Sequence, residues 1–482
     1  MKVLVAEKIC QDGVKLLRDC GLEVDYCPTI TREDLLSTID QYDGLIVRSI
    51  PIVDEELLNA ATNLKVVGRA GNGVDNINMS LATQKGVIVV NTPDANSVSA
   101  CELTIGHIIA SARNLPQANA HLKSGQWGRS RFQGTELQGK KLGIIGLGRI
   151  GTLVATRMSS FGMKIYAYDP YITDKQFQKA GAEKVDTLED LMRLADILTI
   201  HTPRTKETMN MVRKEHFQMA KRGLRVVNCA RGGLINEEDL AWALEEGIVA
   251  SAGFDVLSKE PCTDSPLYKF DNFIVTPHIG ATTDEAQDAV GMSVAQEVVS
   301  ALNGEMVPNA VNLPMVKGQD WVALQPCLNL AETLGKLFYQ LEKDVVERVE
   351  VQYLGNATKW ESDLVTLAVI KGLFEPILME QINYVNAKLV AESRGVAIAE
   401  SKESECSYYS NLLRVKVFAG GKEYEYAGTI TELGEIHIVN INGFRIDFKP
   451  SHYMVVAENL NAPGQIGKMG TCLGRNKVNI GN

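Results

Sequence analysis

Short apolar runs alternate with amphipathic stretches along the N-terminal part of the chain. The strand-like runs are Lys2–Ala6, Leu22–Cys27, Gly44–Val47, Leu64–Val67 and Val87–Asn91. Between them, apolar residues recur at helical spacing in Gly13–Asp19, Arg32–Ile39 and Glu55–Ala60. Strands that alternate with short helices are typical of a parallel sheet covered by helices on both faces.

A long apolar-patterned helix, predicted over Ser97–Leu122, leads into a second alternation. Its strand-like runs are Lys141–Ile145, Lys164–Asp169, Ile197–His201, Val226–Asn228, Ser251–Asp255 and Phe273–Thr276. A second long helix, predicted over Asp284–Leu302, stops at Asn303-Gly304, a pair that commonly ends helices. Two doubly wound sheets joined by two long helices predict hinged domains with a cleft between them. The first domain would then be discontinuous and take in the segment after this second crossing.

The pattern changes after Asn312. Helical stretches and strand-like runs no longer alternate at Leu328–Glu342, Arg348–Tyr353, Ser362–Asn383, Leu412–Phe418, Glu435–Ile441 and Phe444–Phe448. We expect a separate α+β domain there. The final residues predict a strand, a turn, a helix and a strand at Tyr453–Ala457, Asn461–Gly464, Gln465–Gly474 and Lys477–Ile480. Because a lone βαβ unit cannot bury both faces of its sheet, we expect the chain to end inside a fourth domain.

Composition narrows the classes of function. Apolar residues make up 45% of the 482 residues, and the formal net charge is -10. A nucleic-acid-binding protein would usually be basic, so we expect no nucleic-acid partner. No apolar run approaches the roughly 18 residues that a membrane span needs. The nine cysteines are scattered without a C-x-x-C pair, which argues against a metal site and against a disulfide framework. A reducing cytoplasm fits this pattern best.

The clearest motif is Gly146-Leu147-Gly148-Arg149-Ile150-Gly151, between a predicted strand and a predicted helix over Arg149–Ser160. The three glycines suit a tight turn, a close approach of the backbone to a pyrophosphate, and close packing of helix on strand. The helix N-terminus favours the phosphates. Asp169 ends the next strand, where a carboxylate binds the adenosine ribose hydroxyls and repels a 2′-phosphate. The motif predicts NAD as the cofactor; a plain strand-to-helix turn with a surface Asp is the alternative.

Three polar residues follow later strands, at the edge where open α/β sheets place their ligands: Arg231, Glu260 and His278. Oxidation of a secondary alcohol needs a base for the hydroxyl proton, and an imidazole suits that role. A paired carboxylate fixes the tautomer of an imidazole, and a guanidinium can clamp a carboxylate and polarise a carbonyl. Each residue alone is as well explained by a structural role, but together they supply a complete set.

With these motifs the sequence resembles the D-isomer-specific 2-hydroxyacid dehydrogenases. The glycine-rich motif, Asn228-Cys229-Ala230-Arg231-Gly232-Gly233, Glu260-Pro261 and Pro277-His278-Ile279-Gly280-Ala281 occur in the order typical of that family. The resemblance implies His278 as acid/base, Glu260 as its partner and Arg231 as substrate clamp. It also implies cofactor contacts from Asn72, Gly146, Gly148, Arg149, Ile150, Gly151, Asp169, Thr202, Cys229, Ala230, Asp255, Gly280 and Ala281.

Within the family, the stretches 45–49, 67–76 and 132–137 resemble the branch that oxidises 3-phospho-D-glycerate at the first step of L-serine biosynthesis. Arg48 and Arg69 end consecutive strand units and could neutralise a phosphate, although one of them could instead form a structural ion pair. The turn Asn72-Gly73-Val74 could hold the substrate carboxylate through backbone N–H groups. Arg129 and Arg131 form a basic spot that could serve the same subunit, a neighbouring one, or only solvent.

The C-terminal part resembles that of longer members of the branch. Tyr384-Val385-Asn386-Ala387-Lys388, followed by Arg394-Gly395, resembles their intervening domain, and the stretch 455–467 resembles the opening of a serine-sensing ACT domain. About half of an ACT unit would be missing, so serine inhibition is not expected to follow from the resemblance. The resemblance and the apolar helix over Ser97–Leu122 also predict a homodimer or homotetramer.

The expected fold class is α/β, with a flavodoxin-like substrate domain, a Rossmann NAD domain and a C-terminal α+β domain. The expected boundaries are 1–97 with 286–312, 98–285, 313–451 and 452–482. Two other functions remain open at this point. One is reduction of 2-oxoglutarate or another 2-oxoacid, and the other is an NAD-sensing corepressor, which would carry the same three polar residues.

Overall fold

The computed structural model describes residues 1–305, 307–314, 321–378, 382–451, 453–458, 460 and 462–478. The chain forms two compact units, Met1–Met315 and Val316–Asn482, and each is described by itself. Among the described residues, no helix is both long enough and apolar enough to cross a membrane.

A five-stranded parallel sheet forms the first part of unit 1, in the order β2-β1-β3-β4-β5. Its strands are β1 (Lys2–Val5), β2 (Glu23–Tyr26), β3 (Gly44–Val47), β4 (Val66–Arg69) and β5 (Ile88–Val90). Its helices are α1 (Gln11–Asp19), α2 (Arg32–Thr38), α3 (Glu55–Ala60) and α4 (Met79–Gln84). This strand order is that of flavodoxin-like folds, which confirms the fold predicted for this region.

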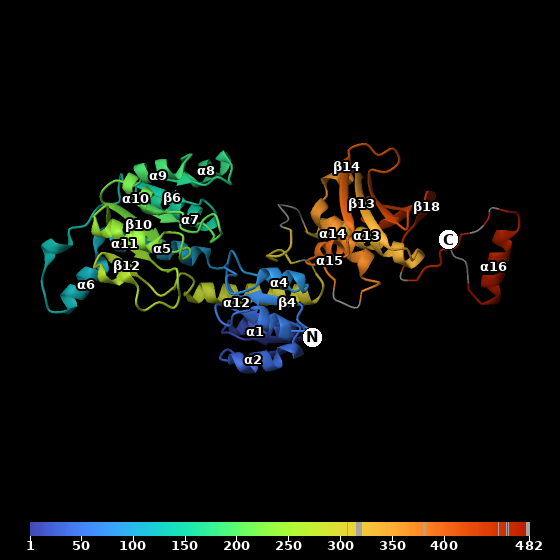
Figure 1. Cartoon of the computed structure of the whole chain (residues 1–482), viewed down its shortest axis with the longest axis horizontal. Coiled ribbons are helices and arrows are strands. Elements are labelled where there is room, and N and C mark those ends of the chain that lie inside the picture. Colours follow the sequence, from blue (N-terminus) through green and yellow to red (C-terminus); the bar gives the residue numbers. More distant parts are fainter. Residues whose placement is uncertain are drawn as a thin grey trace. The chain divides into compact units, whose positions relative to one another are not determined.

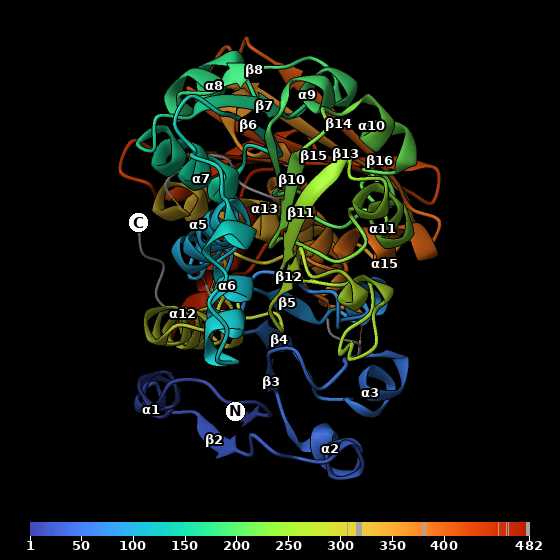
Figure 2. The same cartoon turned by 90° about the vertical axis from the view of Figure 1, so that its left-hand side faces the viewer.

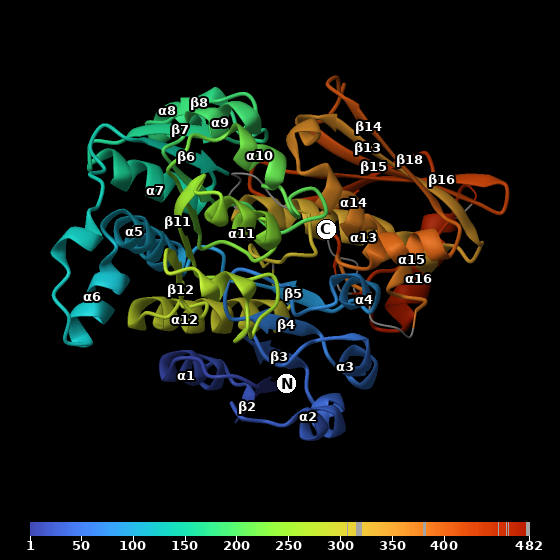
Figure 3. The ribbon, with the colours of Figure 1, turned by 60° about the vertical axis from the view of Figure 1, so that its left-hand side comes forward.

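The two faces of this sheet have separate cores because successive side chains of a strand point to opposite faces. Val3 and Val5 pack with residues of α1 and α12 (Asp284–Leu302), whereas Leu4 packs with residues of α2, α3 and α4. Helix α12 thus lies against the first sheet although it follows the second one in sequence (Figure 3).

The second part of unit 1 is a seven-stranded parallel sheet in the order β12-β11-β10-β9-β6-β7-β8 (Figure 2). Its strands are β6 (Lys141–Ile145), β7 (Lys164–Tyr168), β8 (Glu183–Lys184), β9 (Ile197–Ile200), β10 (Leu224–Asn228), β11 (Val249–Phe254) and β12 (Phe273–Val275). Its helices are α7 (Arg149–Ser159), α8 (Asp174–Ala180), α9 (Leu188–Leu194), α10 (Lys214–Met219) and α11 (Glu237–Glu245). Two halves that diverge from β6 and β9 are the Rossmann arrangement, as predicted.

The predicted single helix over Ser97–Leu122 is wrong, because the structure has two helices there. They are α5 (Ser97–Arg113) and α6 (Leu115–Lys123), and Asn114 between them adopts the left-handed conformation with φ 53°. Asparagine tolerates this conformation, and the proline in the first turn of α6 cannot continue a helix but starts one well. Helix α6 therefore stands away from the sheet (Figure 1).

Unit 2 contains a six-stranded mixed sheet in the order β14-β13-β15-β16-β17-β18. Its strands are β13 (Val346–Gly355), β14 (Ala397–Glu403), β15 (Asn411–Ala419), β16 (Lys422–Ile430), β17 (Ile436–Ile441) and β18 (Phe444–Phe448), and its helices are α13 (Trp321–Leu341), α14 (Ser362–Phe374) and α15 (Ala387–Ser393). The α+β prediction is confirmed. The helix predicted over Ser362–Asn383 is too long, because α14 ends at Phe374 and Pro376, two residues later, has no backbone N–H to continue the helical hydrogen bonds; residues 379–381 lie outside the described part.

The last described helix is α16 (Gln465–Arg475), close to the helix predicted over Gln465–Gly474. The strand predicted at Tyr453–Ala457 is wrong, because no described strand pairs with this segment. A strand forms only where a neighbouring strand accepts and donates its hydrogen bonds. Asn461 and the end of the strand predicted at Lys477–Ile480 lie outside the described residues.

Candidate active site

The glycine-rich motif forms the turn between β6 and α7. Gly146 has φ 86°, and a Cβ there would lie 2.8 Å from the carbonyl oxygen of His201, so the turn needs glycine. A Cβ on Gly151 would collide with the carbonyl oxygen of Gly146, which shows how closely the helix packs on the turn. Gly148, in contrast, faces open space. An anion could therefore approach the backbone at Gly148 and the N-terminus of α7.

Asp169 lies beside this turn. The backbone N–H of Leu147 donates to its Oδ2 at 2.9 Å, and the N–H of Tyr171 donates to its Oδ1 at 3.0 Å. The carboxylate is thus held next to the glycine-rich motif, where an adenosine ribose would lie. Thr202 follows β9, and its Oγ1 is buried without a hydrogen-bond partner among the described residues. Both observations fit a dinucleotide that supplies the remaining hydrogen bonds.

Most of the other predicted cofactor residues lie beyond the carboxyl ends of strands of the same sheet: Cys229 and Ala230 after β10, Asp255 after β11, and Gly280 and Ala281 after β12; Asn72 instead follows β4 of the first sheet. Cys229 is buried, and burial raises the pKa of its thiol, so its side chain is uncharged where it lines the site. Ile150 packs on the core beneath α7. Arg149 forms an ion pair with Asp94, so in this state its guanidinium is engaged by a carboxylate.

His278 and Glu260 form a direct pair. His278 Nδ1 lies 2.6 Å from Glu260 Oε2, and the N–H of Leu257 donates to Glu260 Oε1 at 2.9 Å. The Nε2 face of the imidazole is left for a substrate. Burial raises the pKa of the Glu260 carboxyl, but hydrogen bonds from His278 and Leu257 and the charges of His278 and Arg231 outweigh burial. The net result is a pKa below the usual value, so Glu260 is an anion at neutral pH.

The loop that carries His278 is fixed by Asp255, a buried carboxylate at the end of β11. Asp255 Oδ1 accepts from Thr276 Oγ1 at 2.6 Å and from the N–H of Ile279 at 2.8 Å, and its Oδ2 accepts from the N–H of Gly280 at 2.8 Å. His278 itself has φ 54°, a left-handed conformation that is rare for a residue with a Cβ. Asp255 therefore holds a strained loop in the shape that directs His278 at Glu260.

Arg231 and Arg69 meet over the loop that follows β4. Arg231 Nε lies 3.3 Å from Asp75 Oδ2, and a Cβ on Gly73 would collide with the Arg231 guanidinium. A Cβ on Gly71 would collide with Arg69. The two glycines thus give both side chains room to cross the loop. Arg231 comes from the second sheet and Arg69 from the first, so the site forms between the two sheets of unit 1.

Arg69 lacks a counter-ion in the described part of the chain. Its Nε is buried without a partner, and its Nη1 makes only a 3.5 Å contact with the Ala70 carbonyl. Burial lowers the pKa of Arg69 to about 10; the nearby charges of Arg231 and Arg48 lower it further, and those of Asp75 and Glu7 oppose this without reversing it. Arg69 is therefore a partly buried cation without an ion pair, in which repulsion by two arginines outweighs attraction to two carboxylates, and this arrangement favours binding of an anion.

Arg48 is positioned from two sides. Its backbone N–H, and those of Ser49 and Ile50, donate to Glu7 Oε2 at 2.8–3.0 Å. Its guanidinium donates to Gln287 Oε1 at 2.5 Å, and Gln287 Nε2 donates to the carbonyl of Ala281 at 2.6 Å. Gln287 of α12 thus connects Arg48 of the first sheet to the loop of His278.

The turn Asn72-Gly73-Val74 adjoins these arginines, and the Asn72 carbonyl accepts from Asn91 Nδ2 at 2.6 Å. Arg129 and Arg131 instead lie in a 3-10 turn, Arg129–Phe132, beyond α6. No described contact joins them to His278, Glu260 or Arg231 of the same chain.

Three residues that shape the site were missed by sequence reasoning: Glu7, Asp75 and Gln287. Glu7 lies just after β1, which is the kind of position that singled out Arg48 and Arg69, whereas Asp75 lies six residues beyond the end of β4. Gln287 follows the N-terminus of α12 and carries no signal in one sequence, because its partners are distant in the chain.

The two sheets and this constellation define the class of protein: an NAD-binding oxidoreductase of the 2-hydroxyacid dehydrogenase type. The family model for the D-isomer specific 2-hydroxyacid dehydrogenase NAD binding domain matches residues 105–280. The model for the D-3-phosphoglycerate dehydrogenase intervening domain matches residues 323–442.

Relatives that match almost the whole chain show to which family of this class the protein belongs. The D-3-phosphoglycerate dehydrogenase of Archaeoglobus fulgidus is 43% identical, with 100% of this chain and 91% of that protein covered. The enzyme of the same name from Bacillus subtilis is 41% identical, with 99% and 91% covered. The NAD+-bound 3-phosphoglycerate dehydrogenase structure from Entamoeba histolytica is 31% identical at a TM-score of 0.55, with 66% of this chain and 99% of that chain covered. This chain belongs to the D-3-phosphoglycerate dehydrogenase family.

Proposed function

We propose that this chain oxidises 3-phospho-D-glycerate to 3-phosphohydroxypyruvate with NAD, at the first step of L-serine biosynthesis. The observation that carries the proposal is the convergence of Arg48, Arg69 and Arg231, of which Arg69 has no carboxylate partner. A substrate with a carboxylate at one end and a phosphate dianion at the other balances these charges. A hydroxy acid with a single carboxylate would leave part of this positive charge uncompensated.

The residues of the site can each do one part of this oxidation. NAD, which the glycine-rich turn and Asp169 would hold, would supply the acceptor for the hydride from C2 of the substrate. His278 accepts the proton of the C2 hydroxyl at Nε2, while Glu260 holds Nδ1–H and stabilises the imidazolium that forms. Arg231 clamps the carboxylate and polarises the forming C2 carbonyl.

The remaining cations account for the phosphate. Arg48 and Arg69 lie at the carboxyl ends of neighbouring strands β3 and β4, so both can reach one group. The backbone of Asn72-Gly73-Val74 is the proposed partner of the substrate carboxylate. Arg149, released from Asp94, would be free to approach the cofactor phosphates.

The test is NADH formation by the purified chain with 3-phospho-D-glycerate, D-glycerate, D-lactate and D-2-hydroxyglutarate in parallel. We expect turnover of the phosphorylated acid, and a fall in kcat by a factor of about 10²–10⁴ in His278→Ala. His437→Ala is the matched control, because His437 also pairs with a carboxylate, Asp447, but on the antiparallel strands β17 and β18 of unit 2. Turnover of D-2-hydroxyglutarate alone would contradict the proposed substrate, but it would be consistent with the proposed roles of His278, Glu260 and Arg231.

The proposal extends to the organisation of the protein. It includes the predicted boundaries at 1–97 with 286–312, 98–285, 313–451 and 452–482, with the last segment as the beginning of an ACT domain. It also includes a cytoplasmic homodimer or homotetramer. The assembly is supported by α6, which has no buried residue and exposes Leu115 and Leu122.

A further inference from the structure

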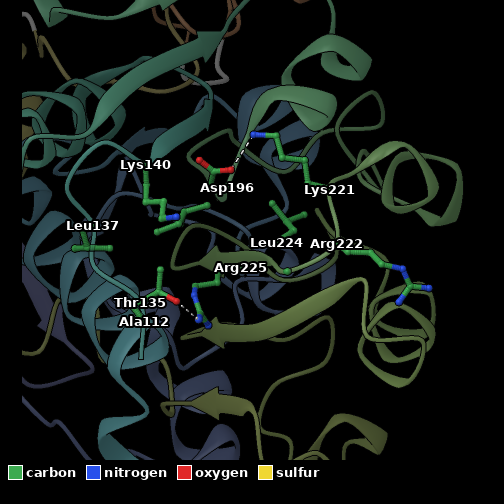
Figure 4. A pocket seen from close by; sticks show the side chains of 11 residues that line it. Ala112, Thr135, Leu137, Lys140, Asp196, Lys221, Arg222, Leu224 and Arg225 are labelled. Atoms are coloured by element: carbon green, nitrogen blue, oxygen red, sulfur yellow. Dashed lines mark hydrogen bonds and ion pairs between the residues drawn. The ribbon is translucent and has the colours of Figure 1, made fainter. Parts of the chain in front are cut away.

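A second cationic site lies in the seven-stranded sheet, at the edge opposite the active site. Residues of the active site follow the carboxyl ends of β9, β10 and β11, whereas this cavity is lined by Asp196 and by Lys221–Arg225, at the amino ends of β9 and β10. Lys140 and Thr135 complete the wall (Figure 4). Because the strands are parallel, the two edges are separated by the whole length of the strands. The cavity is therefore not part of the active site.

The charges around this cavity are unbalanced. Four cationic side chains line it, Lys140, Lys221, Arg222 and Arg225, against the single carboxylate of Asp196. Asp196 is already engaged, because Lys221 Nζ donates to it at 2.8 Å and the N–H of Lys141 at 2.9 Å. Arg222 turns away in Figure 4, and its Nη1 donates to the carbonyl of Glu246 at 3.0 Å.

Of the cations that face the cavity, Arg225 and Lys140 form no ion pair in the described part of the chain, although the charge of Lys140 helps to lower the pKa of Asp196. The Arg225 guanidinium donates only to neutral oxygens: the Ser111 carbonyl at 3.0 Å, Ser251 Oγ at 2.7 Å and Thr135 Oγ1 at 3.2 Å. Burial lowers the pKa of Arg225. In the part of the chain that the structure describes, no carboxylate lies within ion-pair distance of Lys140 or Arg225.

A purely structural role explains only part of this arrangement. Arg225 does connect α5, through Ser111, to the segment after α6, through Thr135. Such a connection accounts for its three hydrogen bonds. It does not account for an open cavity beside a half-buried guanidinium, or for Lys140, whose ammonium is directed toward that cavity (Figure 4). Buried cations are stable when an anion pairs with them.

We propose that this cavity binds a small phosphate dianion, with Lys140 and Arg225 as its direct partners. Lys221 and Arg222 add positive potential at the entrance. The cavity volume of about 180 Å³ suits a phosphate group and is too small for a dinucleotide. The ligand is therefore inorganic phosphate or the phosphate group of a small metabolite. We call this the basal phosphate site.

The test is calorimetric titration of the full chain with inorganic phosphate at constant ionic strength, in wild type, Lys140→Gln and Lys15→Gln. Lys15 is the matched control, an exposed lysine on α1 without a described ion pair. We expect Lys140→Gln to lose one phosphate per chain, or to bind that phosphate at least about tenfold more weakly, because a charge-assisted hydrogen bond is removed. Lys15→Gln should bind as wild type. Unchanged initial rates in phosphate-free buffer would show that Lys140→Gln is folded.

Arg69→Ala separates this site from the active site. That variant should lose phosphate bound at the active site and keep the basal phosphate, whereas Lys140→Gln should do the reverse. The difference between wild type and Lys140→Gln remains decisive even if the active site binds no phosphate. Glycerol 3-phosphate in place of inorganic phosphate distinguishes a metabolite from the free ion. Equal phosphate binding by wild type and Lys140→Gln would overturn the proposal.

Discussion

Arg69 forms no ion pair in the described part of the chain, and we expect its replacement to raise the stability of the protein and to weaken substrate binding. Replacing it by Met removes a cation whose burial and repulsion by Arg48 and Arg231 outweigh its attraction to Asp75 and Glu7. We expect Arg69→Met to raise the melting temperature of the ligand-free protein by about 1–2 °C for each kcal/mol gained, because the entropy of unfolding is roughly 0.7 kcal/mol/K for a unit as long as Met1–Met315. We also expect the KM for the phosphorylated substrate to rise by a factor of about 10–10², because charge-assisted hydrogen bonds are lost.

Arg69→Lys is the control for this trade-off. It keeps the charge, so the melting temperature should stay near that of wild type, but it loses the planar donor pair, so KM should still rise. Thermal melts without ligand and initial rates with substrate measure the two effects. A lower melting temperature in Arg69→Met would mean that the guanidinium is a structural support.

Glu260 gives a prediction about pH. Its pKa is lowered in the folded state, so the fold favours the carboxylate. This stabilisation is complete above the unfolded-state pKa of about 4.3 and is lost as the pH falls through the lower folded value. Glu260→Gln cannot titrate. The difference in melting temperature between wild type and Glu260→Gln should therefore be largest at and above about pH 5 and shrink below about pH 4. A difference that stays constant down to pH 3 would contradict this.

The residues that sequence reasoning could find share one physical property. Gly146, Asp169, Arg231 and His278 follow predicted strands directly, and the edge of a parallel sheet is where ligands bind. Gln287 and Asp75 act through partners far away in the chain, Arg48 and Arg231. A single sequence records no such distances, so these two residues become visible only when the two sheets are placed together.

At the scale of elements, the shape of the loop after β12 depends on a chain of hydrogen bonds that begins at α5 and is called the relay below. His107 Nε2 lies 3.0 Å from Thr276 Oγ1, which donates to Asp255, and Asp255 holds the loop of His278. Burial lowers the pKa of His107, although the charge of Asp255 opposes this, so a neutral imidazole fits the relay. The relay connects α5, behind the sheet, to the loop of His278 in front of it.

Thr276→Val should loosen this loop while keeping the side-chain volume. We expect kcat to fall about tenfold, since small displacements of a catalytic group are costly, with a smaller change in the KM for NAD. Thr276→Ser keeps the hydroxyl and should retain most of the activity. Steady-state kinetics of both variants give the kcat and KM values. If Val and Ser behave alike, the hydroxyl does not position His278.

The elements that the sequence predicted wrongly also have physical causes. The break at Asn114 is local, and the proline two residues later was its signal, but the apolar pattern continues across it. Strands β14 and β16 were not predicted. In β14 the reason is that most of its side chains are exposed, so apolar and polar residues do not alternate along it. Its place in the sheet comes from parallel pairing with β13, which is a long-range contact.

At the scale of the whole molecule, α6 is the feature that a single chain leaves unexplained. Leu122 is 56% exposed, and Trp127, just beyond the helix, is 85% exposed. Apolar side chains gathered on a projecting element typically mark an interface between subunits. Wild type should therefore run as a dimer or tetramer, and Leu122→Glu should dissociate into smaller species, because a buried charge opposes association.

Light scattering after gel filtration measures the mass directly. Leu433→Glu is the matched control, because Leu433 is 88% exposed in a turn between two antiparallel strands. Replacing it should leave the mass unchanged.

Kinetics of the dissociated Leu122→Glu protein then decide the role of Arg129 and Arg131. If dissociation raises the KM for the phosphorylated substrate, and Arg131→Ala does the same in the intact assembly, these arginines serve the active site of a neighbouring subunit. An unchanged KM in both variants would leave Arg48 and Arg69 as the only phosphate partners proposed for the described site.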